Sequence, residues 1–171
     1  MAKLDSQRLI FGLYLLVLIV IGEVVLIYFN LPAWPAFMVM IFFLIDHMDV
    51  KKAHHILIGG CFGIICIILT KLFIVATARV LGVNPAQILF IVLIVYAIVA
   101  FGEILPVLFN NYAFMFLTIS GLAVTSSHPN PLVWIGVELV GGGIFIAGII
   151  GIMKIMGVQA RKKADTSVKP A

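Results

Sequence analysis

Four long, predominantly apolar stretches constrain this chain more than any other feature of its sequence. They cover residues 9–29, 55–78, 86–109 and 131–153. Each is long enough to cross the roughly 30 Å hydrocarbon core of a bilayer, which takes a helix of about 20 residues. We therefore predict an all-helical integral membrane protein with these stretches as its long spans. Two shorter apolar runs, residues 31–45 and 112–125, would be helices of only about 21–23 Å, and so either short spans or re-entrant hairpins.

The composition excludes soluble proteins. Of the 171 residues, 64% are hydrophobic and 11% are charged, whereas a soluble domain carries about 25% charged residues. These charges are too few to cover a water-exposed surface, so we predict a single membrane domain, residues 1–171, whose principal partner is the lipid bilayer. The net charge of +4 comes from Lys and Arg beside the apolar stretches. This pattern indicates membrane topology, not nucleic-acid binding.

No residue pattern points to catalysis. The sequence has no Ser/His/Asp set, no paired carboxylates in a soluble cleft and no Cys/His metal quartet. The histidines and aspartates of residues 46–55 lack a recognised ligand spacing. We expect no enzyme, no cofactor and no metal site.

Rare polar residues recur in the same order in the two halves of the chain. The recurring residues are Gly22-Glu23, Phe29-Asn30, Gly59-Gly60 and Lys71 in the first half, and Gly102-Glu103, Phe109-Asn110, Gly142-Gly143 and Lys154 in the second. Glu and Asn are seven residues apart in both halves, and the second Gly and Lys are eleven apart. We interpret this pattern as a duplication, with repeats at residues 1–82 and 83–160 followed by a basic cytoplasmic tail, residues 161–171.

The orientation of the two repeats depends on the short runs. If these cross the bilayer, each half has three spans and the repeats are inverted. If they do not, each half has two spans and the repeats are parallel. Nine of the eleven Lys and Arg residues are cytoplasmic in either arrangement, and both place the two termini in the cytoplasm of an inner (plasma) membrane protein. We favour six spans, because the polar linker 46–54 carries the Lys51-Lys52 pair typical of an inner loop.

Ionisable groups inside apolar segments cost several kcal/mol unless they are paired or hydrated, so each is a candidate functional residue. The candidates for a pathway or a buried polar site are Glu23, Glu103, Glu138, Lys71 and His55, with Asn30 and Asn110 beside the short runs. Inverted repeats would group Glu23, Lys71 and Glu138 near the outer mouth, and Glu103, Lys154 and His55 near the inner one. Alternatively, these groups form buried pairs that fix helix register, or the lysines snorkel.

Small residues predict close helix packing in the third and sixth apolar segments. These residues are Gly59 and Gly63 in the third, and Gly143, Ala147 and Gly151 in the sixth. Such stripes let helix backbones approach closely in lipid. We expect the two segments to cross near a symmetry axis or to form a subunit contact.

These features favour a small transporter or channel for a small solute or ion, with its pathway between two inverted repeats. The alternative is a non-transporting membrane subunit, such as a substrate-capture or scaffold component of a larger complex. The small core is also compatible with a homo-oligomer.

Overall fold

The computed structural model describes residues 6–125 and 129–167, the last ten of them as backbone alone. Within these ranges the chain is helical and contains no strand. The helices are α1 (Ser6–Tyr28), α2 (Trp34–Ile45), the short 3-10 helix η1 (Val50–Lys52), α3 (Ala53–Leu81), α4 (Val83–Phe101), α5 (Asn111–Ala123), α6 (Pro131–Gly136), the π-helix η2 (Val137–Gly142) and α7 (Gly143–Ser167). Of the predicted basic tail, residues 168–171 lie outside the described part, as do the side chains of 161–167.

The predicted all-helical fold is confirmed for the described residues. Four helical segments are long and apolar enough to cross a bilayer: Ser6–Tyr28, Val50–Leu81, Val83–Phe101 and Pro131–Gly157. They correspond to the four predicted stretches. The two shorter runs form the short apolar helices α2 and α5.

One predicted boundary was wrong, because α4 ends at Phe101 and not at residue 109. Pro106 has no N–H to continue the helical ladder, and its ring disfavours helical geometry in the residue before it. Residues 102–110 instead form consecutive turns, closed by the hydrogen bond from Leu105 N to Phe101 O at 2.9 Å. This segment connects α4 to α5.

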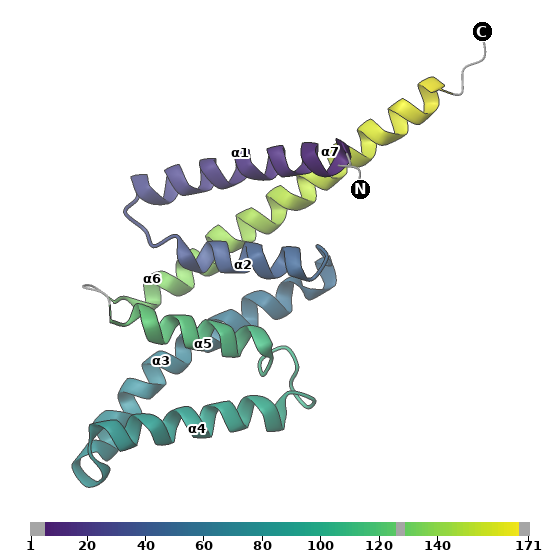
Figure 1. Cartoon of the computed structure of the whole chain (residues 1–171). Helices are drawn as coiled ribbons and strands as arrows, with labels where there is room; N and C mark the ends of the chain where they lie inside the picture. Colours follow the sequence, from purple (N-terminus) through teal and green to yellow (C-terminus); the bar gives the residue numbers. More distant parts are fainter. Residues whose placement is uncertain (1–5, 126–128, 168–171) are drawn as a thin grey trace, which may run out of the picture.

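The helices form an inner group flanked by two outer helices (Figure 1). Within the 18-residue apolar part of each long segment, 39% of the residues are buried in Val50–Leu81 and also in Pro131–Gly157. The corresponding shares are only 6% in α1 and 11% in α4. Helix α1 packs against α7 and α4 packs against α3. The short helices lie between these pairs, with α2 on η2 and α7, and α5 on α3.

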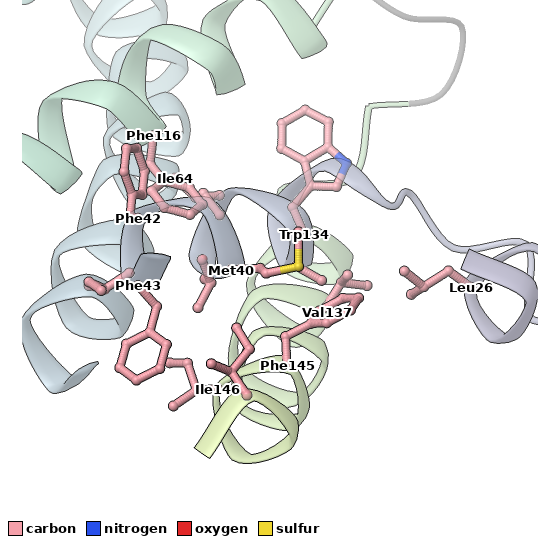
Figure 2. Close-up of a cluster of buried hydrophobic side chains, with 14 residues drawn as sticks. Leu26, Met40, Phe42, Phe43, Ile64, Phe116, Trp134, Val137, Phe145 and Ile146 are labelled. Atoms are coloured by element: carbon pink, nitrogen blue, oxygen red, sulfur yellow. The ribbon is translucent and has the colours of Figure 1, made fainter. Parts of the chain in front are cut away.

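Aromatic side chains fill the centre of the inner group (Figure 2). Trp34 of α2 packs edge-on against Trp134 of α6, with ring centroids 5.4 Å apart. Phe116 of α5 lies 5.9 Å from the ring of Phe42 and 6.2 Å from that of Trp34. In lipid these contacts stabilise the fold by van der Waals packing, because the hydrocarbon outside is as apolar as the interior.

The two ends of α2 are fixed to different helices. Its first residue, Trp34, packs against Trp134 in α6. At its other end, Asp46 accepts a hydrogen bond from the Tyr112 hydroxyl of α5 and pairs with Lys52 at 3.1 Å. Helix α2 therefore extends from the first turns of α6 to the first turns of α3 and α5.

Candidate functional site

Glu138 has the most unusual environment of the predicted polar residues. Its exposed fraction is 0%, and neither carboxylate oxygen has a hydrogen-bond partner among the described residues. It lies in η2, a π-helical turn between two α-helical segments. Such turns are rare and occur frequently at functional sites. A buried, unpaired carboxyl group on an irregular helix is a strong candidate for a ligand-binding residue.

Helix α3 makes room for this carboxyl group at Gly60. A Cβ atom at Gly60 would overlap Oε1 of Glu138 and lie 2.9 Å from the ring of Phe116. The next residue, Cys61, faces the carboxylate from the same helix. The carboxylate is therefore enclosed by the backbone of α3, a thiol and an aromatic ring.

Asn110 approaches α3 at Gly59, the residue before Gly60. A Cβ atom at Gly59 would overlap the side-chain amide of Asn110. Its Oδ1 accepts a hydrogen bond from the amide of Ala113 at 2.9 Å and so caps α5. Its Nδ2 donates to the carbonyl oxygens of His55 at 3.2 Å and Pro106 at 3.0 Å. Asn110 thus joins the start of α5 to the start of α3.

His55 belongs to the first turn of α3, and Asn110 and Glu138 approach the same helix one to two turns further along. Nδ1 of His55 is 3.1 Å from the carbonyl oxygen of Pro106, which also accepts from Asn110. The adjacent glycines Gly59 and Gly60 receive Asn110 and Glu138, respectively. We call His55, Gly59, Gly60, Asn110 and Glu138 the α3 polar site.

The carboxyl group lies near mid-depth in the protein. Glu138 is seven residues after Pro131, where α6 begins, and Gly60 is seven residues after Ala53, where α3 begins. Each interval is about 10 Å of helix. Since α6 and α3 begin at opposite ends of α2, Glu138 lies about midway between these ends.

The remaining predicted charged residues lie outside this site. Glu23 is half-buried on α1, Glu103 is exposed in the turn after α4, and Lys71 is exposed on α3. None of the three forms an ion pair with a described residue. The structure thus places Asn110 and Glu138 against adjacent glycines of α3, with Asn110 bonded to the backbone of His55, and forms no ion pair that would join Glu23 or Glu138 to Lys71.

Asn30 takes a different role from Asn110. It is exposed, with φ of 52° in the turn after α1, a left-handed conformation that asparagine tolerates better than most residues. The N-cap of α2 is Ala33, which makes no side-chain cap hydrogen bond. The side-chain cap that Asn110 provides for α5 therefore has no counterpart at the start of α2.

The third and sixth segments contact each other, and the two predicted stripes of small residues differ in how closely other parts of the chain approach them. Gly59 and Gly63 are closely approached by α5, whose Leu117 amide nitrogen would lie 2.8 Å from a Cβ at Gly63. In the sixth segment, Gly143 and Gly151 have no atom within 4 Å of an added Cβ and Ala147 is exposed. The close contacts fall instead at Gly141, Gly142 and Gly148, against Ala36, Val39 and Leu18. The wider turn of η2 rotates the contact face away from the residues expected for a regular helix.

Three residues near the site were not singled out by the sequence. Phe116 and Cys61 resemble the apolar residues around them, so nothing in the sequence distinguishes them. In the sequence, Tyr112 is only the first residue of a short apolar run. Its hydrogen-bond partner, Asp46, lies 66 residues earlier in the chain, so no local pattern indicates the contact. Among the described residues, no group of three or more His, Cys, Asp or Glu side chains could hold a metal ion.

Comparison with known proteins assigns no family, because no protein-family model, curated protein or solved structure matches the chain. The function is therefore inferred from Glu138 and the residues around it.

Proposed function

We propose that the chain is a small membrane transporter that moves a small solute or ion past Glu138, between two inverted three-segment repeats. The observation that carries this proposal is the unpartnered carboxyl group, 0% exposed and near mid-depth. Carboxylates at such depth are costly and mark substrate or ion pathways in membrane proteins. Transporters with inverted repeats bind their substrates near the midplane, at helices with interrupted geometry. The π-helical η2 is such an interruption.

The pairing of helices supports two equivalent halves. The first half comprises α1, α2 and α3, and the second comprises α4, α5 and the α6–η2–α7 segment. Helix α1 packs on α7 as α4 packs on α3, and α2 packs on η2 and α7 as α5 packs on α3. Exchanging the halves leaves these four pairings unchanged, whereas the contacts of α2 with α3 and of α4 with α5 have no counterpart of similar extent. With three crossings in each half, the repeats would be inverted.

The contacts at the ends of α2 support a crossing by this short helix. A helix of 12 residues is about 18 Å long, less than the hydrocarbon core. Local bilayer thinning accommodates such a mismatch at modest cost. Because α2 joins the starts of α6 and α3, its two ends would face opposite sides of the membrane.

The tight enclosure of Glu138 favours a carrier over an open channel. Phe116, which is 0% exposed, covers the carboxyl group on one side, and the backbone of α3 covers it on another. A solute would reach Glu138 only after η2 moves away from α3 or α5. We therefore propose that this conformation is a closed state of a transporter whose two halves move relative to each other.

If the chain crosses the membrane six times, the turn formed by residues 46–52 lies on the cytoplasmic side, as do both termini. In a background in which Cys61 and Cys66 are replaced by alanine, we expect a cysteine at Lys51 to react with a membrane-impermeant maleimide only in inside-out vesicles. A cysteine at Val83 should react only in intact cells. If α2 and α5 were re-entrant, the two labelling patterns would be exchanged, and the inverted repeat would be excluded.

Transport can be tested without knowing the substrate. We expect vesicles containing the full-length protein to swell faster than protein-free vesicles under an inward gradient of at least one small solute, measured by light scattering. The probes are urea, glycerol and the chloride salts of ammonium, sodium and potassium. Swelling at the protein-free rate with every probe would contradict the proposal and favour a non-transporting subunit of a larger membrane complex.

A further inference from the structure

From the surroundings of Glu138, we infer that its carboxyl group is a proton-binding site that is occupied in this closed conformation and empties when the site opens to water. The chemistry is a simple equilibrium in which a carboxylate oxygen takes up one proton and becomes a neutral acid, with no redox change. That this proton is coupled to solute movement rests on the proposed function. The binding of the proton does not.

The first argument is that no positively charged group among the described residues pairs with the carboxyl group, whose nearest polar neighbour is Cys61. An ionised carboxylate removed from water without a partner costs several kcal/mol even after the protein relaxes. From α3, the carboxylate faces Gly60 and the thiol of Cys61, and α5 contributes the ring of Phe116. No described Lys or Arg forms an ion pair with Glu138. A bound proton removes the charge without needing a counter-ion.

The second argument excludes a metal cation as the better occupant. Sodium, magnesium and calcium ions are hard cations held by several oxygen ligands. Around Glu138 the neighbouring groups are a glycine, a thiol and an aromatic ring. The nearby Oδ1 of Asn110 already accepts a hydrogen bond from Ala113. The ligand that this enclosure fits is therefore a proton.

The third argument connects the proton to the conformation. The Glu138 side chain lies directly against the backbone of α3, at a position where even a methyl group would overlap it. Closure of η2 onto α3 leaves no room for water beside the carboxyl group and so favours its neutral form, whereas hydration on opening favours the charged form. Proton binding would stabilise the closed state, and opening toward one side would release the proton there.

Infrared spectroscopy of the full-length protein in lipid vesicles tests the inference without any transport measurement. At pH 7, we expect wild-type protein to show the C=O absorption of a protonated carboxyl group, and Glu138→Gln to lack it. Glu103→Gln, which changes an exposed carboxyl group, is the matched control and should keep the band. Identical wild-type and Glu138→Gln spectra in this region would overturn the inference. So would a wild-type band that appears only when sodium is removed, because the site would then bind a metal cation.

A second measurement needs no variant, in case Glu138→Gln does not fold. A protonated carboxyl group adds across a C=N bond of an apolar carbodiimide, with its proton going to nitrogen and its oxygen to carbon. The O-acylisourea that forms rearranges by O-to-N acyl transfer to a stable N-acylurea. We expect modification of the peptide that contains Glu138 in wild-type protein, decreasing as the pH is raised. Modification that is independent of pH, or that increases as the pH is raised, would overturn the inference. A protonated Glu138 in a protein that transports nothing would contradict only the proposed function, and transport without a protonated Glu138 would contradict only this inference.

Discussion

Vesicles that contain Glu138→Gln should swell no faster than protein-free vesicles in a solute gradient that accelerates swelling with the wild-type protein. Glutamine has nearly the same shape as glutamate, so it fits the same enclosure beside Gly60. It can neither bind and release a proton nor attract a cation. The expected result is therefore loss of transport in a folded protein, checked by light scattering together with size-exclusion chromatography.

Two other glutamates supply the controls for this experiment. Glu23 is half-buried on an outer helix and Glu103 is exposed in a turn. Both Glu23→Gln and Glu103→Gln should therefore retain the wild-type swelling rate. The opposite outcome would be loss of transport in Glu23→Gln or Glu103→Gln and normal transport in Glu138→Gln. The pathway would then pass Glu23 and Glu103, which the internal repeat relates to each other, and not the α3 polar site.

The long helices were predictable because hydropathy is a local property. A continuous apolar run has few alternatives to a helix in lipid, where each backbone group needs an internal hydrogen-bond partner. The end of α4 was less predictable, since residues 102–109 are nearly as apolar as the helix before them. Because the apolar run continues to residue 109, its composition did not indicate that the helix ends before Pro106.

The glutamates show why the site itself was only partly predictable. Glu23, Glu103 and Glu138 all occur among apolar residues, and the repeat favoured Glu23 and Glu103 as a pair. Burial separates them, and burial depends on the partners of each helix. Helix α1 is mostly exposed, whereas η2 is packed against α2 and α3. The sequence contained Glu138 among its candidates but did not show that it is the buried one.

The two asparagines make the same point about loops. Glu and Asn are seven residues apart in both halves, yet Asn110 caps α5 while Asn30 lies in a turn. Ala36-Phe37-Met38 begins six residues after Asn30, whereas the matching Ala113-Phe114-Met115 begins three residues after Asn110, and Ala33 takes the cap position of α2. The same Glu-to-Asn spacing thus leads to two different roles because the connecting segments differ in length.

The packing of α3 on α5 should depend strongly on the absence of a side chain at Gly63. A Cβ atom there would overlap the carbonyl oxygen of Ala113 and lie 2.8 Å from the amide nitrogen of Leu117. Both are backbone atoms of α5, so neither can rotate away as a side-chain tip could. We expect Gly63→Val to lower the free energy of unfolding by about 1–3 kcal/mol, the typical cost of overpacking a well-packed interior. Thermal unfolding in detergent, followed by tryptophan fluorescence, measures the change.

Gly151→Val is the matched control, because Gly151 also lies within a long helix but has no atom within 4 Å of an added Cβ. Its effect should stay within about 0.5 kcal/mol, as for substitutions away from packed features. The opposite outcome, a stable Gly63→Val and a destabilised Gly151→Val, would mean that the small residues predicted from the sequence, Gly143, Ala147 and Gly151, form the close contact. That contact would have to be with a second copy or another subunit, since the described part of this chain leaves Gly143 and Gly151 open. The pair of variants therefore separates packing within the chain from packing between chains.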